Sequence, residues 1–153
     1  DITYIPVRKS QVYLCIVMDL FSRKIVGWSL RTSLLANLAI ESLKKACQDR
    51  KPMDALILHT DRGCQYTCRP FQSVLAENGI KSSMGRKGDC YDNAVAESFF
   101  STLKTERVKR ESYATIHQAR HRIADYIRFY NKQRRHSTLG HKSPDTYERL
   151  RAA

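Results

Sequence analysis

The stretch Ala55-Leu-Ile-Leu-His-Thr-Asp-Arg-Gly63 decides the expected fold. Its continuous apolar run, Ala55–Leu58, follows a segment with helical periodicity and is typical of a buried strand in a parallel sheet. Asp61 comes shortly after this run and is followed by Gly63. Because α/β sheets place their chemistry at the carboxyl ends of their strands, the stretch predicts an α/β domain with a functional carboxylate at that edge.

The chain before this stretch predicts three strands and a helix. The runs Ile2–Val7, Val12–Asp19 and Lys24–Leu30 are rich in β-branched and aromatic residues, and polar breaks separate them. They therefore predict three successive antiparallel strands. Leu35–Asp49 carries apolar residues at helical spacing and predicts an amphipathic helix that ends before Pro52. Strands followed by a helix and a further strand indicate a layered α/β domain with a mixed sheet.

The chain after the stretch is expected to be mainly helical. The predicted elements there are helices at Pro70–Asn78, from Asp92 or Asn93 to about Val108, and at Thr115–Gln133, and a strand at Ile80–Ser83. Gly79 would stop the first helix, and the loop Met84–Tyr91 looks mobile because it contains two glycines. Ser143–Pro144 would open a final turn. We see no repeat or linker, so we expect one domain over residues 1–153.

The charge balance points to a polyanionic partner. The chain has 27 Lys and Arg residues against 15 Asp and Glu residues, a net charge of +12. Such an excess favours nucleic acid, although a basic solvated surface or a protein that binds anionic membranes has the same signature. Much of the excess lies in the second half, at Arg86–Lys87, Lys104–Arg110, Arg120–Arg122 and Lys132–Arg135. This clustering favours nucleic acid.

Other features of the composition narrow the class of protein. No apolar run approaches the roughly 20 residues that span a bilayer, and no signal-peptide pattern opens the chain. The five cysteines show no paired CxxC spacing, so reduced thiols in a cytoplasmic protein are expected rather than a zinc site. The chain starts at Asp1 without an initiator methionine, so we expect a fragment of a longer protein.

Three carboxylates from separate elements are candidates for a metal site. Asp1 begins the first predicted strand, which we expect to lie beside the strand that precedes Asp61. Glu97 lies on the helix after the loop, thirty-five residues (62 to 96) separating it from Asp61. Such a set suits a hard divalent cation, because Mg²⁺ prefers oxygen ligands. Spacing alone leaves ordinary alternatives open: a chain end, a turn and a solvated helix acid.

Motifs along the chain extend this set. They are Asp1-Ile-Thr-Tyr-Ile5 with Met18-Asp-Leu-Phe-Ser-Arg-Lys-Ile-Val-Gly-Trp28, His59-Thr-Asp-Arg-Gly-Cys-Gln-Tyr66, Asp92-Asn-Ala-Val-Ala-Glu97 continuing to Glu106, and Tyr130-Asn-Lys-Gln-Arg-Arg-His-Ser137 with Leu139-Gly140 and Ser143-Pro144. In this order they resemble the integrase core of insertion-sequence transposases with two reading frames, which belong to the DDE family. The resemblance covers essentially the whole chain.

The resemblance implies a ribonuclease H-like α/β fold, with a mixed five-stranded sheet flanked by helices, as in retroviral integrases. It implies a catalytic triad of Asp1, Asp61 and Glu97 that holds two Mg²⁺ or Mn²⁺ ions. Lys104 occupies the basic position of the family. It lies seven residues, almost two helical turns, after Glu97, so both share a helix face. A cation there would hold substrate phosphate; a surface lysine is the alternative.

Further basic residues are expected to contact DNA along the basic face, namely Arg86, Lys87 and Arg134. For Arg134, as for Asn131 and His136, the sequence leaves open whether the residue is scaffold or DNA contact. We expect Asp19 and Arg23 to fix a turn or an ion pair. Trp28 and His59 are expected to pack.

The implied function is that of a transposase catalytic core, a polynucleotidyl transferase. With bound metal ions it would cleave DNA at the ends of an element and transfer the freed 3′-hydroxyl to target DNA, as a homo-oligomer on DNA in the bacterial cytoplasm at the nucleoid. We expect the upstream DNA-recognition domain of the family to lie outside this sequence. We expect the chain alone to bind metal weakly, because the terminus at Asp1 would fray and its protonated α-amino group would repel a cation.

Two rival functions remain at this point. A ribonuclease H-type nuclease takes an acid from the first long helix, where Glu41 lies, and a late aspartate, for which Asp125 and Asp145 are poor candidates. A non-catalytic nucleic-acid-binding module would use its acids for structure only.

Overall fold

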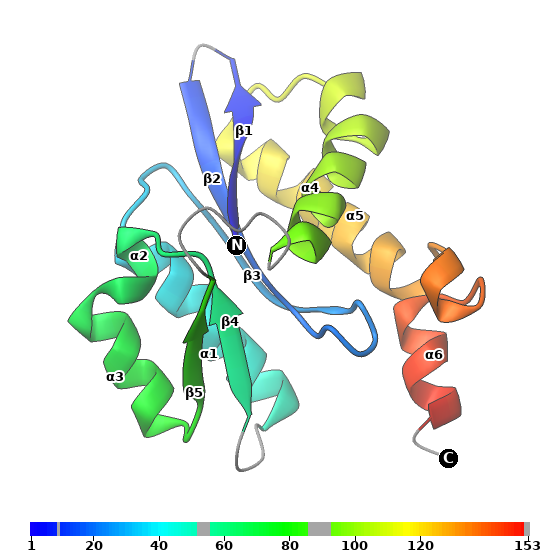
Figure 1. Ribbon diagram of the computed structural model, residues 1–153. Coiled ribbons are helices and arrows are strands. Elements are labelled where there is room, and N and C mark those ends of the chain that lie inside the picture. Colours follow the sequence, from blue (N-terminus) through cyan, green and yellow to red (C-terminus); the bar gives the residue numbers. More distant parts are fainter. Residues whose placement is uncertain (9, 52–55, 86–92, 152–153) are drawn as a thin grey trace.

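Three successive strands open the chain, further strands and helices follow, and the described elements of the last part are all helices (Figure 1). The computed structural model describes residues 1–8, 10–51, 56–85 and 93–151. The strands are β1 (Ile2–Val7), β2 (Ser10–Met18), β3 (Ile25–Arg31), β4 (Ile57–Thr60) and β5 (Lys81–Met84), and the helices are α1 (Ala36–Arg50), α2 (Cys64–Thr67), α3 (Arg69–Glu77), α4 (Ala94–Glu106), α5 (Ile116–Lys132) and α6 (Pro144–Arg151). The predicted strands and helices are therefore present, α2 is an addition that the sequence did not predict, and the final turn expected at Ser143–Pro144 is the start of the helix α6.

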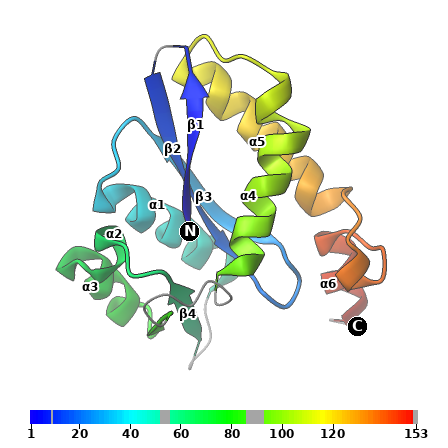
Figure 2. The same ribbon diagram turned by 45° about the horizontal axis from the view of Figure 1, so that its top comes forward.

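The first three strands form an antiparallel sheet in the order β1-β2-β3. In β1, Ile5 and Val7 are buried while Tyr4 and Pro6 are exposed, as expected for a strand with one covered face. The covered face packs against α4 and α5, where Phe99 is one of the core side chains. Figure 2 shows these two helices lying along the sheet. This core fixes the position of α4 relative to β1.

The remaining two strands, β4 and β5, form a parallel pair with Leu58 opposite Ser82. α2 and α3 connect them, as a parallel pair requires. A second core cluster packs α1 against α3 and includes Leu38 and Phe71. The carboxyl end of β4 leads directly to Asp61.

The single mixed sheet that we expected is not formed among the described residues. β1 pairs with β2 and β4 with β5, but no hydrogen bonds join the two sheets there. The pairing of β1 with β2 starts at Asp1, which lies opposite Ile16. The residues of β2 after Ile16 therefore have no partner in β1, and this end of β2 faces β4 across a cavity of about 630 Å³. As a result Ile57 is 62% exposed, and β4 is not the buried strand that its apolar run predicts.

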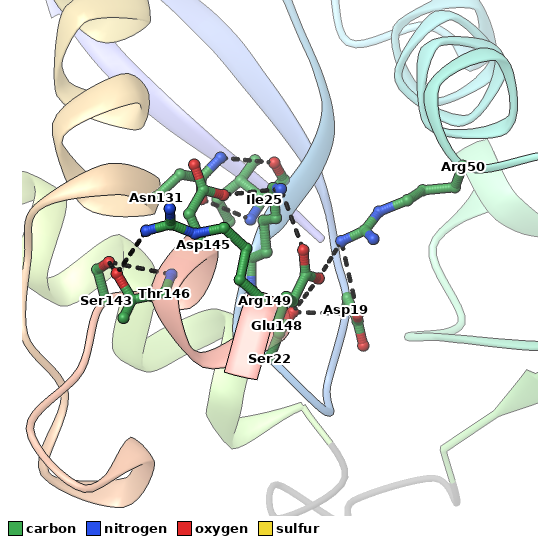
Figure 3. A network of polar contacts seen from close by, with 11 residues as sticks. Asp19, Ser22, Ile25, Arg50, Asn131, Ser143, Asp145, Thr146, Glu148 and Arg149 are labelled. Carbon is green, nitrogen blue, oxygen red and sulfur yellow. Dashed lines mark hydrogen bonds and ion pairs between the residues drawn. The ribbon is translucent and has the colours of Figure 1, made fainter. Parts of the chain in front are cut away.

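A polar network fastens α6 to the turn between β2 and β3 (Figure 3). Lys24 lies 2.7 Å from Asp145 and 3.1 Å from Glu148. Arg50, at the end of α1, pairs with Glu148 and lies 3.6 Å from Asp19. Asp19 also accepts a hydrogen bond from a backbone N–H of the turn, which is the structural role expected for it. The network therefore joins three distant parts of the chain.

The helix α5 is held to β3 by Asn131. Its side chain accepts a hydrogen bond from the Ile25 N–H and donates one to the Ile25 carbonyl oxygen, each at 2.9 Å. This double contact gives Asn131 a scaffold role within the closing signature, the motif Tyr130–Ser137 with Leu139-Gly140 and Ser143-Pro144. In the part of the chain that the structure describes, no helix has the length and apolar character needed to cross a membrane.

Candidate active site

Three separate elements bring the predicted triad to one pocket. Asp1 immediately precedes β1, Asp61 follows β4, and Glu97 lies in the first turn of α4. The residues that line the pocket are Asp1, Ile2, Thr3, Asp61, Asn93, Glu97, Phe100, Ser101 and Lys104. Residues as distant in the sequence as Asp1 and Lys104 thus surround a common space, which all three carboxylates and the predicted cation line.

The carboxylates are not yet placed as ligands of one ion. Among the described residues no group of three His, Cys, Asp or Glu side chains lies close enough together to hold a metal. Asp1 accepts a hydrogen bond from the Ile2 N–H at 2.6 Å, and Asp61 accepts one from the Gly63 N–H at 2.9 Å. These bonds turn two carboxylates toward their own backbone. The donor set fits Mg²⁺ or Mn²⁺, but a bound ion requires the side chains to rotate inward.

The backbone at Asp1 is fixed, contrary to our expectation of a fraying terminus. Its α-amino group donates a hydrogen bond to the Ile16 carbonyl oxygen at 3.0 Å, and the Ile16 N–H donates to the Asp1 carbonyl oxygen at 3.0 Å. Burial lowers the pKa of this α-amino group, while Cys15 and Asp61 act in the opposite direction. The α-amino group therefore loses its proton, and with it its positive charge, at a lower pH than an ordinary α-amino group does.

The position of Asp61 is set by a tight turn at the end of β4. Arg62 donates from Nε to the Gly85 carbonyl oxygen at 2.9 Å, and the Gly85 N–H donates to the Thr60 carbonyl oxygen at 3.2 Å. A Cβ atom at Gly63 would lie 3.0 Å from Oδ1 of Asp61. The glycine therefore leaves room for the carboxylate as well as for the turn.

The helix α4 presents one face to the pocket and the other to the core. Glu97 and Lys104 both line the pocket, as their seven-residue spacing predicts, while Phe99 and Leu103 are buried in the core. The ammonium nitrogen of Lys104 lies 4.5 Å from the centroid of the Tyr4 ring. Lys104 thus lies between the pocket and an exposed aromatic side chain of β1.

The closing signature holds the far end of α4 rather than the pocket. Arg134 donates to both carboxylate oxygens of Glu106 at 2.8–3.1 Å, and Tyr126 donates its hydroxyl proton to Glu106 at 2.7 Å. The Arg134 guanidinium lowers the pKa of Glu106. His136 stacks edge-on against Tyr130, and burial lowers the pKa of its ring. Arg134, which we expected to contact DNA, therefore has a scaffold partner and does not line the pocket.

Some predicted residues have a different outcome. Arg86 and Lys87, expected to contact DNA, lie outside the described residues, as does most of the loop predicted to be mobile. Glu41, the acid that a ribonuclease H-type nuclease would need, pairs with Arg31 and does not line the pocket. His59 bonds to the Ser83 hydroxyl at 3.0 Å, consistent with a packing role.

Asn93 in the pocket and Tyr4 beside it are among the residues that the sequence analysis did not assign to the site. Asn93 lines the pocket four residues before Glu97, so the i, i+4 spacing of a helix face would have identified it. Tyr4 is exposed, whereas its neighbour Ile5 in β1 is buried. The alternation of side chains along a strand would have been enough to predict an exposed aromatic residue at this position.

Comparison with known proteins shows the family to which the chain belongs. A family model described as "Integrase core domain" matches residues 1–90, and a second model with the same description matches residues 78–144. The chain is 44% identical to the transposase for insertion sequence element IS904 of Lactococcus lactis, over 97% of its own length and 59% of that protein. It is 41% identical to transposase InsF for insertion sequence IS3A of Escherichia coli, over 97% of its own length and 52% of that protein.

The chain therefore spans between half and three-fifths of these relatives. Among solved structures, the simian T-cell lymphotropic virus intasome matches with a TM-score of 0.79 at 17% identity, over 96% of this chain and 51% of that chain. The HTLV-2 integrase catalytic core domain in complex with magnesium matches with a TM-score of 0.74 at 16% identity, over 96% and 91% of the two chains. These likenesses confirm the ribonuclease H-like fold class.

Proposed function

The chain belongs to the integrase core domain family, and on this premise we propose that it is the catalytic core of an insertion-sequence transposase. Its reaction is metal-dependent cleavage of DNA followed by transfer of the freed 3′-hydroxyl to a second phosphodiester. The observation that carries the proposal is the convergence of Asp1, Asp61 and Glu97 on one pocket that also contains Lys104.

The side chains of the pocket suit this chemistry. Asp1, Asp61 and Glu97 supply the oxygen ligands that a pair of divalent ions needs. Bound ions would stabilise the attacking and leaving oxygens of an in-line displacement. Lys104 would hold a non-bridging oxygen of the phosphodiester, because its ammonium group lies at the wall of the same pocket. Asp61 and Glu97 are exposed, so both are free to rotate toward an ion.

The partners follow from charge and from the relatives. We propose that element ends and target DNA bind the basic surface, since the chain carries a net charge of +12. We further propose two ions per site and a homo-oligomer that assembles on DNA at the nucleoid. Support for an oligomer comes from the HTLV-2 integrase core, whose solved structures are described as trimeric and dimeric forms.

The two rival functions fit the site less well. A ribonuclease H-type nuclease needs an acid from α1 in the pocket, but Glu41 pairs with Arg31 instead. A binding module with purely structural acids would pair them with cations. Within residues 1–8, 10–51, 56–85 and 93–151, neither Asp61 nor Glu97 forms an ion pair, whereas Glu106, Glu111 and Glu148 all do.

The direct test is strand cleavage and joining on labelled element ends, in a protein with the full length of the relatives. Asp61→Asn and Glu97→Gln keep shape but remove the charge that an ion needs, so each should lower the rate at least about 100-fold. Glu41→Gln is the matched control on α1 and should keep most activity. Near-normal joining by Asp61→Asn or Glu97→Gln contradicts the proposal. A Glu41→Gln variant as inactive as the other two favours the nuclease.

A further inference from the structure

A row of three side chains crosses the antiparallel sheet beside the pocket. Tyr4 of β1 lies directly opposite Tyr13 of β2, and Tyr13 lies directly opposite Arg31 of β3. Residues that face each other across neighbouring strands share one face of a sheet. This is the face away from the α4 and α5 core, since the alternate residue Ile5 belongs to that core.

The row is open at its Tyr4 end. α1 packs mainly against β3 and β2, and Glu41 of α1 pairs with Arg31. Tyr13 is half-buried, and its hydroxyl oxygen accepts a hydrogen bond from Gln11 at 2.8 Å. Tyr4 is 55% exposed. The row therefore offers one accessible aromatic ring, next to a second ring that is already fixed in place.

The open end of the row also carries the cation of the active site. Lys104 projects from α4, on the other face of the sheet, and its ammonium nitrogen still lies 4.5 Å from the Tyr4 ring centroid. It therefore reaches past the outer edge of β1. The same side chain lines the pocket of the three carboxylates. A phosphate held by Lys104 would thus lie within one nucleotide of the exposed ring.

We propose that Tyr4 is a stacking platform for an unpaired DNA base next to the phosphodiester in the pocket. This inference rests on the proposed function and adds the state of the substrate, namely that the strand is unpaired beside the reacting phosphate. An aromatic ring beside a cation is the usual arrangement for binding single-stranded nucleic acid, because the base stacks while the cation holds the backbone. A paired internal base cannot use the ring, because its neighbours in the duplex cover both of its faces.

The test compares two DNA duplexes of equal length and sequence bound to this chain. One has three unpaired bases at one end, with 2-aminopurine among them, and in the other the same bases are paired and both ends are blunt. The wild-type chain should bind the unpaired end about tenfold more tightly, which corresponds to about 1.4 kcal/mol. It should also quench the 2-aminopurine fluorescence, as stacking does.

Three variants separate stacking from folding. Tyr4→Ala should lose both the preference and the quenching, and Tyr4→Phe should keep both because it keeps the ring. Tyr147→Ala is the matched control, since Tyr147 on α6 also has a cation, Arg151, at 5.6 Å from its ring. It should behave like the wild type. Thermal unfolding of each variant checks that it is folded.

The outcomes distinguish this inference from the proposed function. Duplex binding without preference for the unpaired end, or a preference that survives in Tyr4→Ala, overturns the stacking platform and leaves the transposase proposal standing. Binding of neither DNA at low salt overturns both.

Discussion

At the scale of single residues, Gly63 shows how a backbone position controls a reactive group. A Cβ atom there would meet Oε1 of Gln65 at 2.9 Å and Oδ1 of Asp61 at 3.0 Å. Both atoms end side chains that can move, and the Gly63 backbone, with φ −56° and ψ 143°, suits any residue. The glycine is therefore required by the position of the Asp61 carboxylate rather than by strain.

This predicts opposite results for two glycine substitutions. Gly63→Ala should leave the free energy of unfolding almost unchanged but displace Asp61, lowering DNA cleavage about tenfold, or about 1.4 kcal/mol. Gly79→Ala should do the reverse, because Gly79 has φ +66° with open space around it. A side chain there costs about 1–2 kcal/mol of stability. Urea denaturation and a cleavage assay measure the two effects, and a Gly63→Ala variant with unchanged cleavage contradicts the argument.

The sequence predicts single residues well where a regular element supplies the spacing. Asp61 was found from its place after an apolar run, and the seven-residue spacing placed Lys104, which the family resemblance singled out, on the same helix face as Glu97. Arg134 could not be placed this way, because it follows the end of α5 and its partner Glu106 is twenty-eight residues away in α4. A long-range ion pair leaves no local signal in the sequence.

At the scale of elements, α4 and α5 are joined by charges as well as by their core. Glu111, in the connection between them, pairs with Arg107 at 2.8 Å and with Arg122 of α5 at 2.5 Å. Arg122 is the main reason that the pKa of Glu111 falls to about 2 from its ordinary value near 4.5, and Arg107 adds to the effect.

A pH dependence of stability follows. Because the folded pKa of Glu111 is depressed, its contribution is fully present above about pH 4.5 and is lost as the pH falls toward 2. Glu111→Gln should therefore lower the free energy of unfolding at pH 6 by up to ~1 kcal/mol and make no difference near pH 2. Urea denaturation at both pH values tests this. A difference that persists at pH 2 would show that packing, not charge, is lost.

The order of elements could be predicted, whereas the pairing of the sheets could not. The alternation in Ile2–Val7 and the helical spacing in Leu35–Asp49 are local patterns, and the structure places β1 and α1 there within one residue. The neighbours of β4 depend on contacts between residues far apart in the sequence. Its apolar run predicted a buried strand, but Ile57 faces a cavity and remains exposed. The four-residue helix α2 is too short to show a helical period.

At the scale of the whole molecule, ion pairs divide the positive charge into two groups. Lys24, Arg31, Arg50, Arg107 and Arg122 pair with carboxylates and stabilise the fold. The net charge of +12 nevertheless remains for an external polyanion. Binding of duplex DNA should therefore have little sequence preference and weaken steeply with salt, as counterions are released.

A salt titration by fluorescence anisotropy tests this expectation. The logarithm of the affinity should fall linearly with the logarithm of the salt concentration. Lys104→Ala should reduce this slope by about 1 at most, because it removes one phosphate contact, while it lowers cleavage much more. Affinity that does not change with salt contradicts an electrostatic DNA surface.

The central claim is that Asp1, Asp61 and Glu97 together hold the ions for DNA cleavage, and Mn²⁺ binding tests it most directly. Without DNA the chain should bind Mn²⁺ weakly, because the carboxylates are not yet gathered around one point. A DNA duplex supplies phosphate oxygens as further ligands and should raise the affinity. Electron paramagnetic resonance of free Mn²⁺, with DNA present, should show binding by the wild type and by Glu77→Gln, which removes an exposed acid at the end of α3. Asp61→Asn and Glu97→Gln should lose this binding, and wild-type affinity in either variant would contradict the account.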